Sequence, residues 1–486
     1  MPGLNAGLYV GLSGIQAQQA ALNVVGNNIA NVNTPNYSRQ QADLTSNQAL
    51  ASGGVYFGTG VTLSAVQGIR DQFLDLQIYH QTALQSGAQD RYSALNAISP
   101  TLADSGTTGL AAQIQSFFQG FQNLAARPED AALRTNVIGQ AQNMISSMQS
   151  QYQMLTDQQN TADQSVQNLV TQVNTLTSQI AQLNTVVTTE TSPGSRNDAR
   201  DQRAALTTQL AKLVGIHVTE GSQGEYQITL DSGGAVLVSG NTQYQMDASS
   251  TSATTGYHLV KVDQGSTAVD VTSALQNGSL GAQLDLRDNV YAGYKTQLDT
   301  LAAGIASQVN LQHQKGYALD GTTTGLNFFT GDPATGLPTG ATAANSYQGA
   351  VTNLTVNSAI VNDPSLIAAA GAAGAAGDNA NANALGNLQF TGGTNASGLV
   401  LGSPFSTVVS SFVSKVGTDT QSWNVQSTTQ QNLVTALQAQ RDSISGVDLN
   451  EEAASLMTLQ QGYQASTRFL SVINQLMQQL VTSFGQ

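Results

Sequence analysis

Few side chains in this sequence have the type and spacing that catalysis or metal binding requires. The chain has no cysteine, which removes thiol nucleophiles, disulfides and iron–sulfur clusters. None of its four histidines has the HExxH or HxH spacing of a zinc site, and no GxSxG elbow or Walker A loop is present. We therefore expect no metal, no other cofactor and no enzymatic activity. The four histidines, which we expect to be structural or at the surface, are His80, His217, His258 and His313.

The densest charged segment, SRNDARDQR, runs from Ser195 to Arg203. Its three arginines could form a phosphate or catalytic site. The segment also suits the start of a helix, because Asp198 would lie near the positive end of the helix dipole. The arginines would then pair with a neighbouring helix. We adopt this second interpretation.

Composition argues against nucleic acid and against an anionic membrane surface as partners. The 486 residues include 16 Lys and Arg against 30 Asp and Glu, so the net charge is −14. Both partners require clustered basic side chains. No apolar run reaches the length of a transmembrane helix. The first basic residue is Arg39, so the basic region of a secretory signal is missing. We expect a cytoplasmic protein, or one exported without a cleaved signal peptide.

The N-terminal segment has the pattern of a helix from about Asn5 to Asn31. Apolar residues recur every seven positions, but Gly11 and Gln18 leave the second stripe of a coiled coil incomplete. Asparagines occupy the last turns before Pro35, where their amides can bond to neighbouring backbone, either between subunits or at a frayed helix end. The candidate assembly residues at this end are Leu8, Ile15, Leu22, Ile29, Asn27, Asn28, Asn31 and Pro35.

After Gly446 the pattern predicts a helix of about 35 residues with two apolar stripes, interrupted at Glu452 and Ser466. Burying these stripes does not offset the entropy of ordering so long a helix. We therefore expect terminal helices that are weakly ordered in a monomer and are completed by neighbouring copies. The candidate residues for assembly and for binding a partner protein are Leu449, Leu456, Leu459, Tyr463, Leu470, Ile473, Met477 and Leu480.

The interior alternates between helical and strand periodicity. Helices are predicted over 71–98, 163–187, 195–214 and 284–313, with a helical hairpin around Pro193-Gly194. An extended stretch or hairpin is predicted over 38–70, strands over 216–283, and a further strand near Val351–Val361.

These elements predict an α+β protein, mainly α, with a nested architecture. Paired N- and C-terminal coiled-coil helices would enclose an inner helical bundle, which in turn would carry an inserted β-rich outer domain. The expected divisions are a terminal domain of 1–65 with 445–486, a helical domain of 66–215 with 285–318 and 375–444, and a β-rich insert of 216–284 with 319–374.

The two ends of the chain carry specific motifs. Residues 21–40, ALNVVGNNIANVNTPNYSRQ, resemble the N-terminal motif of the axial proteins of the bacterial flagellum, a family of rod, hook and hook-associated proteins. Residues 446–457, GVDLNEEAASLM, followed by QQGYQA, resemble the matching C-terminal motif. Within that family, TPNYSRQ is most similar to hook-associated proteins of the hook–filament junction, since rod and hook proteins usually have Gly-Phe after the proline.

The resemblance implies a structural adaptor of the flagellum, made in the cytoplasm and exported by the type III apparatus without a cleaved signal. A ring of identical subunits would form outside the cell, between the hook protein below and the next hook-associated protein above. A cytoplasmic export chaperone would bind the apolar stripe of the C-terminal helix. The alternatives are a hook or distal rod subunit and, less favoured, a secreted adhesin.

Overall fold

The computed structural model describes residues 2–34, 36–52, 55–103, 109–265, 267–331, 347–391, 393–394, 400–401 and 404–484. Pro35 therefore lies outside the described residues. The chain forms two compact units: unit 1 comprises 1–87, 168–280 and 428–486, and unit 2 comprises 88–167 and 281–427. Both chain ends belong to unit 1, which agrees with the predicted nested, mainly α, α+β fold.

Aspartate side chains mark the starts of three long helices. Asp71 accepts backbone hydrogen bonds at the start of α2 (Gln72–Leu102), Asp130 does so for α4 (Ala131–Thr189), and Asp448 for α12 (Leu449–Phe484). These bonds satisfy N–H groups that a helix leaves unpaired. Helix α5 (Pro193–Leu213) instead begins with proline, which suits a first helical position.

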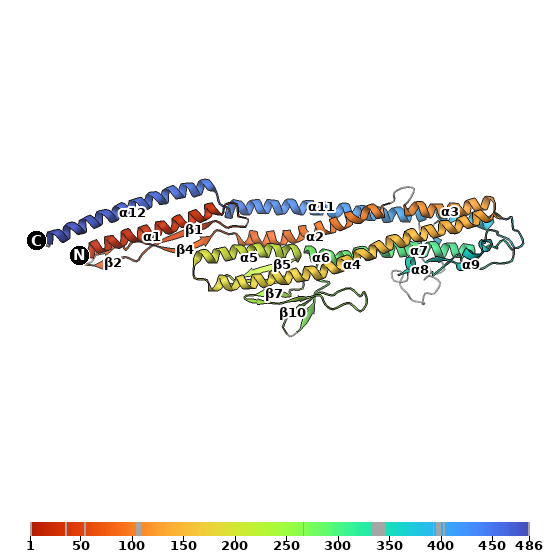
Figure 1. Ribbon diagram of the computed structural model, residues 1–486, viewed down its shortest axis with the longest axis horizontal. Helices are drawn as coiled ribbons and strands as arrows, with labels where there is room; N and C mark the ends of the chain where they lie inside the picture. Colours follow the sequence, from red (N-terminus) through yellow and green to blue (C-terminus); the bar gives the residue numbers. More distant parts are fainter. Residues whose placement is uncertain are drawn as a thin grey trace. The chain divides into compact units, whose positions relative to one another are not determined.

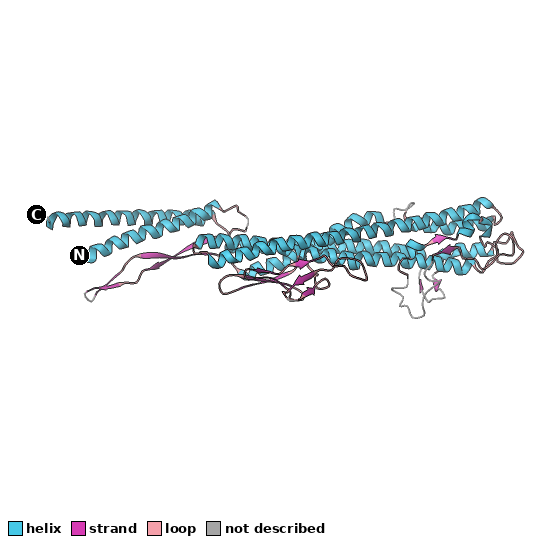
Figure 2. Ribbon diagram, turned by 60° about the horizontal axis from the view of Figure 1, so that its bottom comes forward, coloured by secondary structure: helices cyan, strands magenta, loops and turns pink. Residues whose placement is uncertain are grey.

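In unit 1, the terminal helices α1 (Pro2–Ala30) and α12 lie side by side and antiparallel, with both chain ends at the same end of the pair (Figures 1 and 2). Strand β1 (Gln40–Ser46) pairs antiparallel with β4 (Val61–Gly68), from Gln40 opposite Gly68 to Ser46 opposite Val61. Strands β2 (Leu50–Ser52) and β3 (Val55–Phe57) extend this hairpin, which lies along α1. The hairpin predicted over 38–70 is confirmed.

The rest of unit 1 combines the C-terminal part of α4 and helix α5 with two small antiparallel sheets. One has the order β5 (Ile216–Glu220), β6 (Tyr226–Leu230), β7 (Val236–Ser239) and β8 (Thr242–Gln243). The other has the order β11 (Ala268–Asp270), β10 (Lys261–Asp263) and β9 (Met246–Asp247). The predicted helical hairpin and the strands within 216–283 are therefore confirmed.

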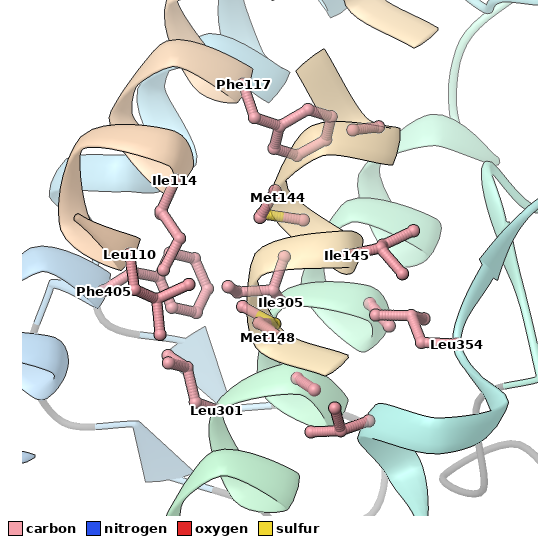
Figure 3. Packing of buried hydrophobic residues seen from close by; sticks show 14 of the residues in the cluster. Leu110, Ile114, Phe117, Met144, Ile145, Met148, Leu301, Ile305, Leu354 and Phe405 are labelled. Carbon is pink, nitrogen blue, oxygen red and sulfur yellow. The ribbon is translucent and has the colours of Figure 1, made fainter. Parts of the chain in front are cut away.

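Unit 2 is organised around a large apolar core. It contains α3 (Leu110–Ala126), α7 (Tyr291–His313) and α10 (Ala380–Asn387), with parts of α2, α4 and α11 (Phe405–Ser445). Helix α6 (Gly278–Asp285) and the π-helical turn Leu286–Val290 precede α7. Phe117, Met144, Ile305 and Phe405 converge in this core (Figure 3). The predicted helices over 71–98, 163–187 and 284–313 fall within these elements.

The strand predicted near Val351–Val361 is confirmed only over two residues, β13 (Thr355–Val356). The rest of the segment forms the helices α8 (Ala350–Asn353) and α9 (Ser358–Asn362). The Asn357 side chain accepts a hydrogen bond from Ala359 N at 3.0 Å and starts α9, a local polar contact that competes with strand pairing.

The segment 319–374, predicted as part of the β insert, belongs to unit 2, whereas 216–280 belongs to unit 1. Besides β13, its described part holds the two-residue strand β12 (Phe329–Thr330), which pairs with β13, and a 3-10 turn over Pro364–Leu366. Further along the chain lie a second 3-10 turn (Leu388–Phe390) and the two-residue strands β14 (Gly393–Thr394) and β15 (Val400–Leu401). The division into three domains stays a prediction.

Candidate assembly surface

Three glycines of α1 lie in its contact with α12. A methyl group added at Gly7 would lie 3.1 Å from Ile473 Cδ1, and one added at Gly11 would lie 3.2 Å from Leu470 Cδ1. At Gly14 it would lie 3.0 Å from Ser466 Oγ. Ile473 and Leu470 of α12 therefore pack against bare backbone of α1. Gly11, which interrupts the coiled-coil pattern in the sequence, is part of the contact itself.

Sequence reasoning missed this glycine seam, although a signal was present. Gly7, Gly11 and Gly14 recur at spacings of four and three, which places them on one helix face. Each glycine in a helix interior lowers helix stability by about 1 kcal/mol relative to alanine. Three glycines on one face therefore indicate that another element packs closely against that face.

The predicted stripe of α1 lies next to this seam. Leu8, Ile15, Leu22 and Ile29 are all half-buried. The buried apolar side chains of α1 lie outside the predicted stripe and are small: Ala17, Ala21 and Val25.

The predicted stripe of α12 occupies one helix face. Seven of its eight residues are half-buried, and Leu449 is 50 % exposed. Glu452, which interrupts the stripe, is buried near the start of the helix. The half-buried residues are Leu456, Leu459, Tyr463, Leu470, Ile473, Met477 and Leu480.

The terminal pair is almost free of charge. No charged side chain occurs before Arg39, and Arg468 is the only one after Glu452. Arg468 is exposed on the side of α12 opposite the seam, together with Gln461, Gln464 and Gln475. Met457 and Val472 are exposed on the same side, so this face of α12 is nearly neutral but mixes amide and apolar side chains.

Exposed apolar side chains concentrate on the terminal pair and its hairpin. Eleven of the twenty large hydrophobic residues that are exposed in the described ranges lie between residues 2 and 68 or in α12. A groove of about 490 Å³ also opens between α1, β1 and α12, lined by Val24, Leu44 and Leu459 among others. Exposed apolar area on this scale is typical of surfaces that partners cover. The eleven are Tyr9, Leu12, Leu44, Tyr56, Phe57, Leu449, Met457, Phe469, Val472, Leu476 and Val481.

The asparagines at the end of α1 bond within their own chain. Asn28, 1 % exposed, donates to Gln40 O at 2.8 Å. Its Oδ1 accepts hydrogen bonds from Gln40 N and from the Tyr37 hydroxyl, both at 2.9 Å. Asn31, half-buried, donates to Asn27 Oδ1 at 2.9 Å. Asn28 therefore closes the connection between α1 and β1.

Residues 36–40 join this connection to three further helices. Ser38 N donates to Asp201 Oδ2 of α5 at 3.0 Å, and Gln40 Nε2 donates to Asp198 Oδ1 at 3.3 Å. Arg39 N donates to Ser445 O of α11 at 2.8 Å, and the Arg39 guanidinium pairs with Glu451 of α12. The motif is therefore the point at which α1, the hairpin, α5, α11 and α12 meet.

Asn36 adopts a left-handed backbone conformation, with φ of 62°. Asparagine tolerates this region better than most residues. Its side-chain oxygen accepts a hydrogen bond from Arg441 Nη1 at 2.8 Å. The motif therefore turns sharply at Asn36 while remaining bonded to α11.

Burial shifts the pKa values of two side chains in the motif, Tyr37 and its neighbour Asp201. Burial, followed by the nearby carboxylates of Asp201, Asp198 and Glu452, raises the pKa of the Tyr37 phenol, so Tyr37 remains a donor to Asn28. Burial also raises the pKa of the Asp201 carboxyl, although the hydrogen bond from Ser38 N opposes this shift.

The arginine cluster of 195–203 has a structural role. Arg196 donates to Glu190 O, just past the end of α4, at 2.6 Å. Arg203 is fully buried, donates to Asn184 Oδ1 of α4 at 2.7 Å and lies over the Tyr226 ring at 3.5 Å. The predicted pairing of arginines with a neighbouring helix is therefore confirmed for Arg203, whereas Arg196 bonds to the connection between α4 and α5. Asp198 bonds to the N-terminal motif.

Within the described ranges, His, Asp and Glu side chains form no group of three or more that could hold a metal ion. Membrane-spanning candidates are also absent there, since no described helix combines the necessary length and hydropathy. His80 and His217 are exposed, as predicted for surface residues.

His313 of unit 2 is fully buried. Its Nδ1 lies 2.8 Å from Leu326 O, and its Nε2 accepts a hydrogen bond from Ala368 N at 3.0 Å. These two bonds require a neutral ring that is protonated at Nδ1. Burial lowers the pKa of His313 to about 4.

Comparisons with known proteins cover both the interior and the ends of the chain. The family model described as the flagellar hook-associated protein FlgK helical domain matches residues 95–329. The flagella basal body rod protein model matches residues 8–37, and the flagellar basal body rod FlgEFG protein C-terminal model matches 438–483.

Related proteins match over nearly the whole length. Flagellar hook-associated protein 1 of Salmonella typhimurium is 30 % identical, over 97 % of this chain and 98 % of that protein. The Escherichia coli protein of the same name is 31 % identical over the same shares. The structure of the flagellar hook junction protein FlgK from Burkholderia pseudomallei shares the fold, with a TM-score of 0.65 and 19 % identity, over 76 % of this chain and 100 % of that structure.

Proposed function

Because the chain belongs to the family of flagellar hook-associated protein 1, we propose that it is a structural adaptor that joins hook and filament outside the cell. The observation that carries this proposal is the terminal pair α1 and α12. It is nearly free of charge and exposes eleven large apolar side chains together with the hairpin. Surfaces of this kind are stable in water when copies of the chain cover one another.

In this proposal the terminal pairs of identical subunits assemble into a ring. The hook protein would contact the ring from below, and the next hook-associated protein from above. The candidate residues on α1 and α12 would take part by holding the two helices together, since most of them are half-buried along the pair. Ring formation would supply the burial that a single copy lacks.

The glutamine-rich face of α12 suits the inner wall of such a ring. Gln461, Gln464 and Gln475 present amides, and Arg468 is the single charge on this face. A nearly neutral wall offers an exported, unfolded chain no strong electrostatic field to bind.

The chain would leave the cytoplasm through the flagellar type III apparatus without a cleaved signal. Before export, a chaperone would bind the apolar stripe that runs from Leu449 to Leu480. In the folded chain the same stripe packs against glycines of α1, so a chaperone bound to it would take the place of α1. An apolar helix face is a common recognition surface.

A hook or distal rod subunit is the alternative within the same class of proteins. The rod-protein models match the two end segments, 8–37 and 438–483. The interior, 95–329, instead matches the FlgK helical domain. The interior therefore favours the junction protein over the rod or hook.

Electron microscopy of cells that lack the gene tests the proposal. We expect hooks without filaments and flagellin lost to the medium, with both defects reversed by complementation. Missing hooks would place the protein in the rod or hook instead. Normal filaments would refute a junction role.

A further inference from the structure

A second apolar groove, of about 670 Å³, opens in unit 1 between α2, α11 and the sheet that begins with β5. Phe73, 70 % exposed, and Leu76 contribute from α2, while Leu433, 43 % exposed, and Leu437 contribute from α11. Ile216 of β5 closes the apolar wall. Polar groups of His80, His217 and Asp231 also line the groove. The groove therefore combines an apolar interior with hydrogen-bonding groups.

The hairpin carries a matching surface. Tyr56 is 77 % exposed and Phe57 is 43 % exposed, both on β3 near the far end of the hairpin. No charged residue occurs between Leu44 and Ile69. A two-stranded hairpin is marginal in water by itself, and aromatic side chains exposed near its end add no stability to a single copy.

These two surfaces do not meet within one copy. The chain runs from Phe57 to Gly68 mainly as the extended strand β4, and a strand advances about 3.3 Å per residue, so this stretch spans roughly 35 Å. Gly60 lies against Val10 and Ser13 of α1, which directs the hairpin toward the N-terminal end of α1 (Figure 2). The groove instead begins at Phe73, just after the base of the hairpin.

We propose that the groove of one copy receives Tyr56 and Phe57 from the hairpin of a second copy. This inference rests on the proposed function, because it names the contact by which neighbouring subunits recognise one another. Aromatic side chains are large apolar anchors, and the tyrosine hydroxyl finds a partner among the polar groups of the groove.

Two properties favour a second copy as the occupant. The chain carries a net charge of −14, yet the hairpin between Leu44 and Ile69 has no charge, so the two surfaces meet without like-charge repulsion. The hairpin surface and the groove also lie at different places on the same chain. Such a pair makes a head-to-tail contact, in which every copy uses each surface once, and head-to-tail contacts generate rings and stacks.

The contact is small beside a typical stable interface, which buries about 800 Å² per partner. It therefore fixes how neighbouring copies are aligned, while the contacts of the terminal helices hold the copies together. We expect it in assembled junctions and not in the dilute monomer.

Cross-linking tests this contact cleanly because the chain has no cysteine. Two differently tagged copies, one carrying Tyr56→Cys and the other Leu433→Cys, are expressed together in cells that lack the wild-type gene. Hook–basal bodies are isolated and treated with a short bismaleimide. A cross-linked pair that contains both tags is expected, at least about tenfold above a control pair, because yield follows local concentration.

The matched control replaces Leu433→Cys by Val269→Cys, which is 42 % exposed on β11 of the same unit. If the chain is present in hook–basal bodies that carry filaments, but Tyr56→Cys and Leu433→Cys give no cross-link, the docking contact is overturned and the junction role stands. A cross-link within one chain carrying both changes would also overturn it.

If the wild-type chain is absent from hook–basal bodies, the proposed function falls first and this inference falls with it. If instead Tyr56→Cys and Leu433→Cys chains fold normally but fail to enter junctions that accept Val269→Cys, both surfaces are needed for assembly. That result would support the contact.

Discussion

Replacing Asn28 by alanine provides the sharpest test of the connection between α1 and β1. Asn28 makes three hydrogen bonds within a buried site: one donated to Gln40 O, and two accepted from Gln40 N and the Tyr37 hydroxyl. A typical hydrogen bond contributes about 1 kcal/mol net, and buried groups that lose a partner cost about 1–3 kcal/mol each. We therefore expect Asn28→Ala to destabilise this connection by about 3 kcal/mol.

Amide hydrogen exchange measures that loss directly, because the Gln40 N–H is held by the Asn28 side chain. A change of 1.4 kcal/mol is tenfold in an equilibrium constant, so about 3 kcal/mol corresponds to exchange at Gln40 that is roughly a hundredfold faster. Amides of the buried core of unit 2 should exchange as in the wild type.

Asn23→Ala is the matched control, since Asn23 is an exposed asparagine on the same helix. It removes the same side chain and improves helix propensity by up to about 0.7 kcal/mol, as Asn28→Ala also does. Equal exchange rates at Gln40 in the two variants would refute the assignment of Asn28 as the closing residue. Asn28→Ala should also reduce filament assembly in complemented cells, where Asn23→Ala should not.

Three further predictions concern the seam and the core. Ile473→Asp should abolish filament assembly while the circular dichroism of the other helices persists. Gln464→Asp, on the opposite face of α12, should assemble. Assembly of both variants would show that the stripe is not needed for assembly. Gly11→Leu should separate α1 from α12 and raise amide exchange across both helices, since a methyl group there already lies 3.2 Å from Leu470 Cδ1; unchanged exchange would contradict the seam. Folding lowers the pKa of His313 from 6.5 to about 4. Between these pH values the unfolded chain therefore binds a proton at His313 that the folded chain does not bind. The free energy of unfolding should be unaffected by His313 above pH 6.5 and should fall by about 3 kcal/mol as the pH approaches 4. Urea unfolding across this range should show a shallower pH dependence for His313→Gln and no such change for the exposed control His217→Gln.

Local patterns in the sequence predicted most of the secondary structure. The seven-residue spacing of Val166, Val173, Ile180 and Val187 identified a helix, and these four residues are buried in α4. Alternation after Gly215 identified the strands of unit 1. These signals depend on periodicity and on turn residues that act within a few positions, so they can be read without knowledge of the fold.

The prediction failed where a local contact competes with the pattern. The segment around Val351–Val361 is rich in residues that favour strands, yet the Asn357 cap starts a helix there. A helix cap prevails over strand formation when no partner strand lies alongside the segment. Whether a partner strand is present is decided by the tertiary structure.

The candidate site divides in the same way. The apolar stripe of α12 could be predicted from the sequence because its residues repeat at a fixed spacing, and seven of the eight share the half-buried face. The role of Gly11 could not, because a glycine reports nothing about what lies opposite it until Leu470 is placed there.

Sequence alone therefore determined the type of most elements, the near absence of charge at both ends and the resemblance of the end motifs to flagellar axial proteins. Only the tertiary structure decided that Asn28 bonds to Gln40, that Ser38 and Arg39 connect α5 with α11 and α12, and that the α1–α12 seam is lined by glycine. The physical reason is distance along the chain. Helix and turn signals act between neighbours, whereas these contacts join residues up to about 460 positions apart, and hydrogen bonds and close packing between them exist only once the fold has brought both partners together.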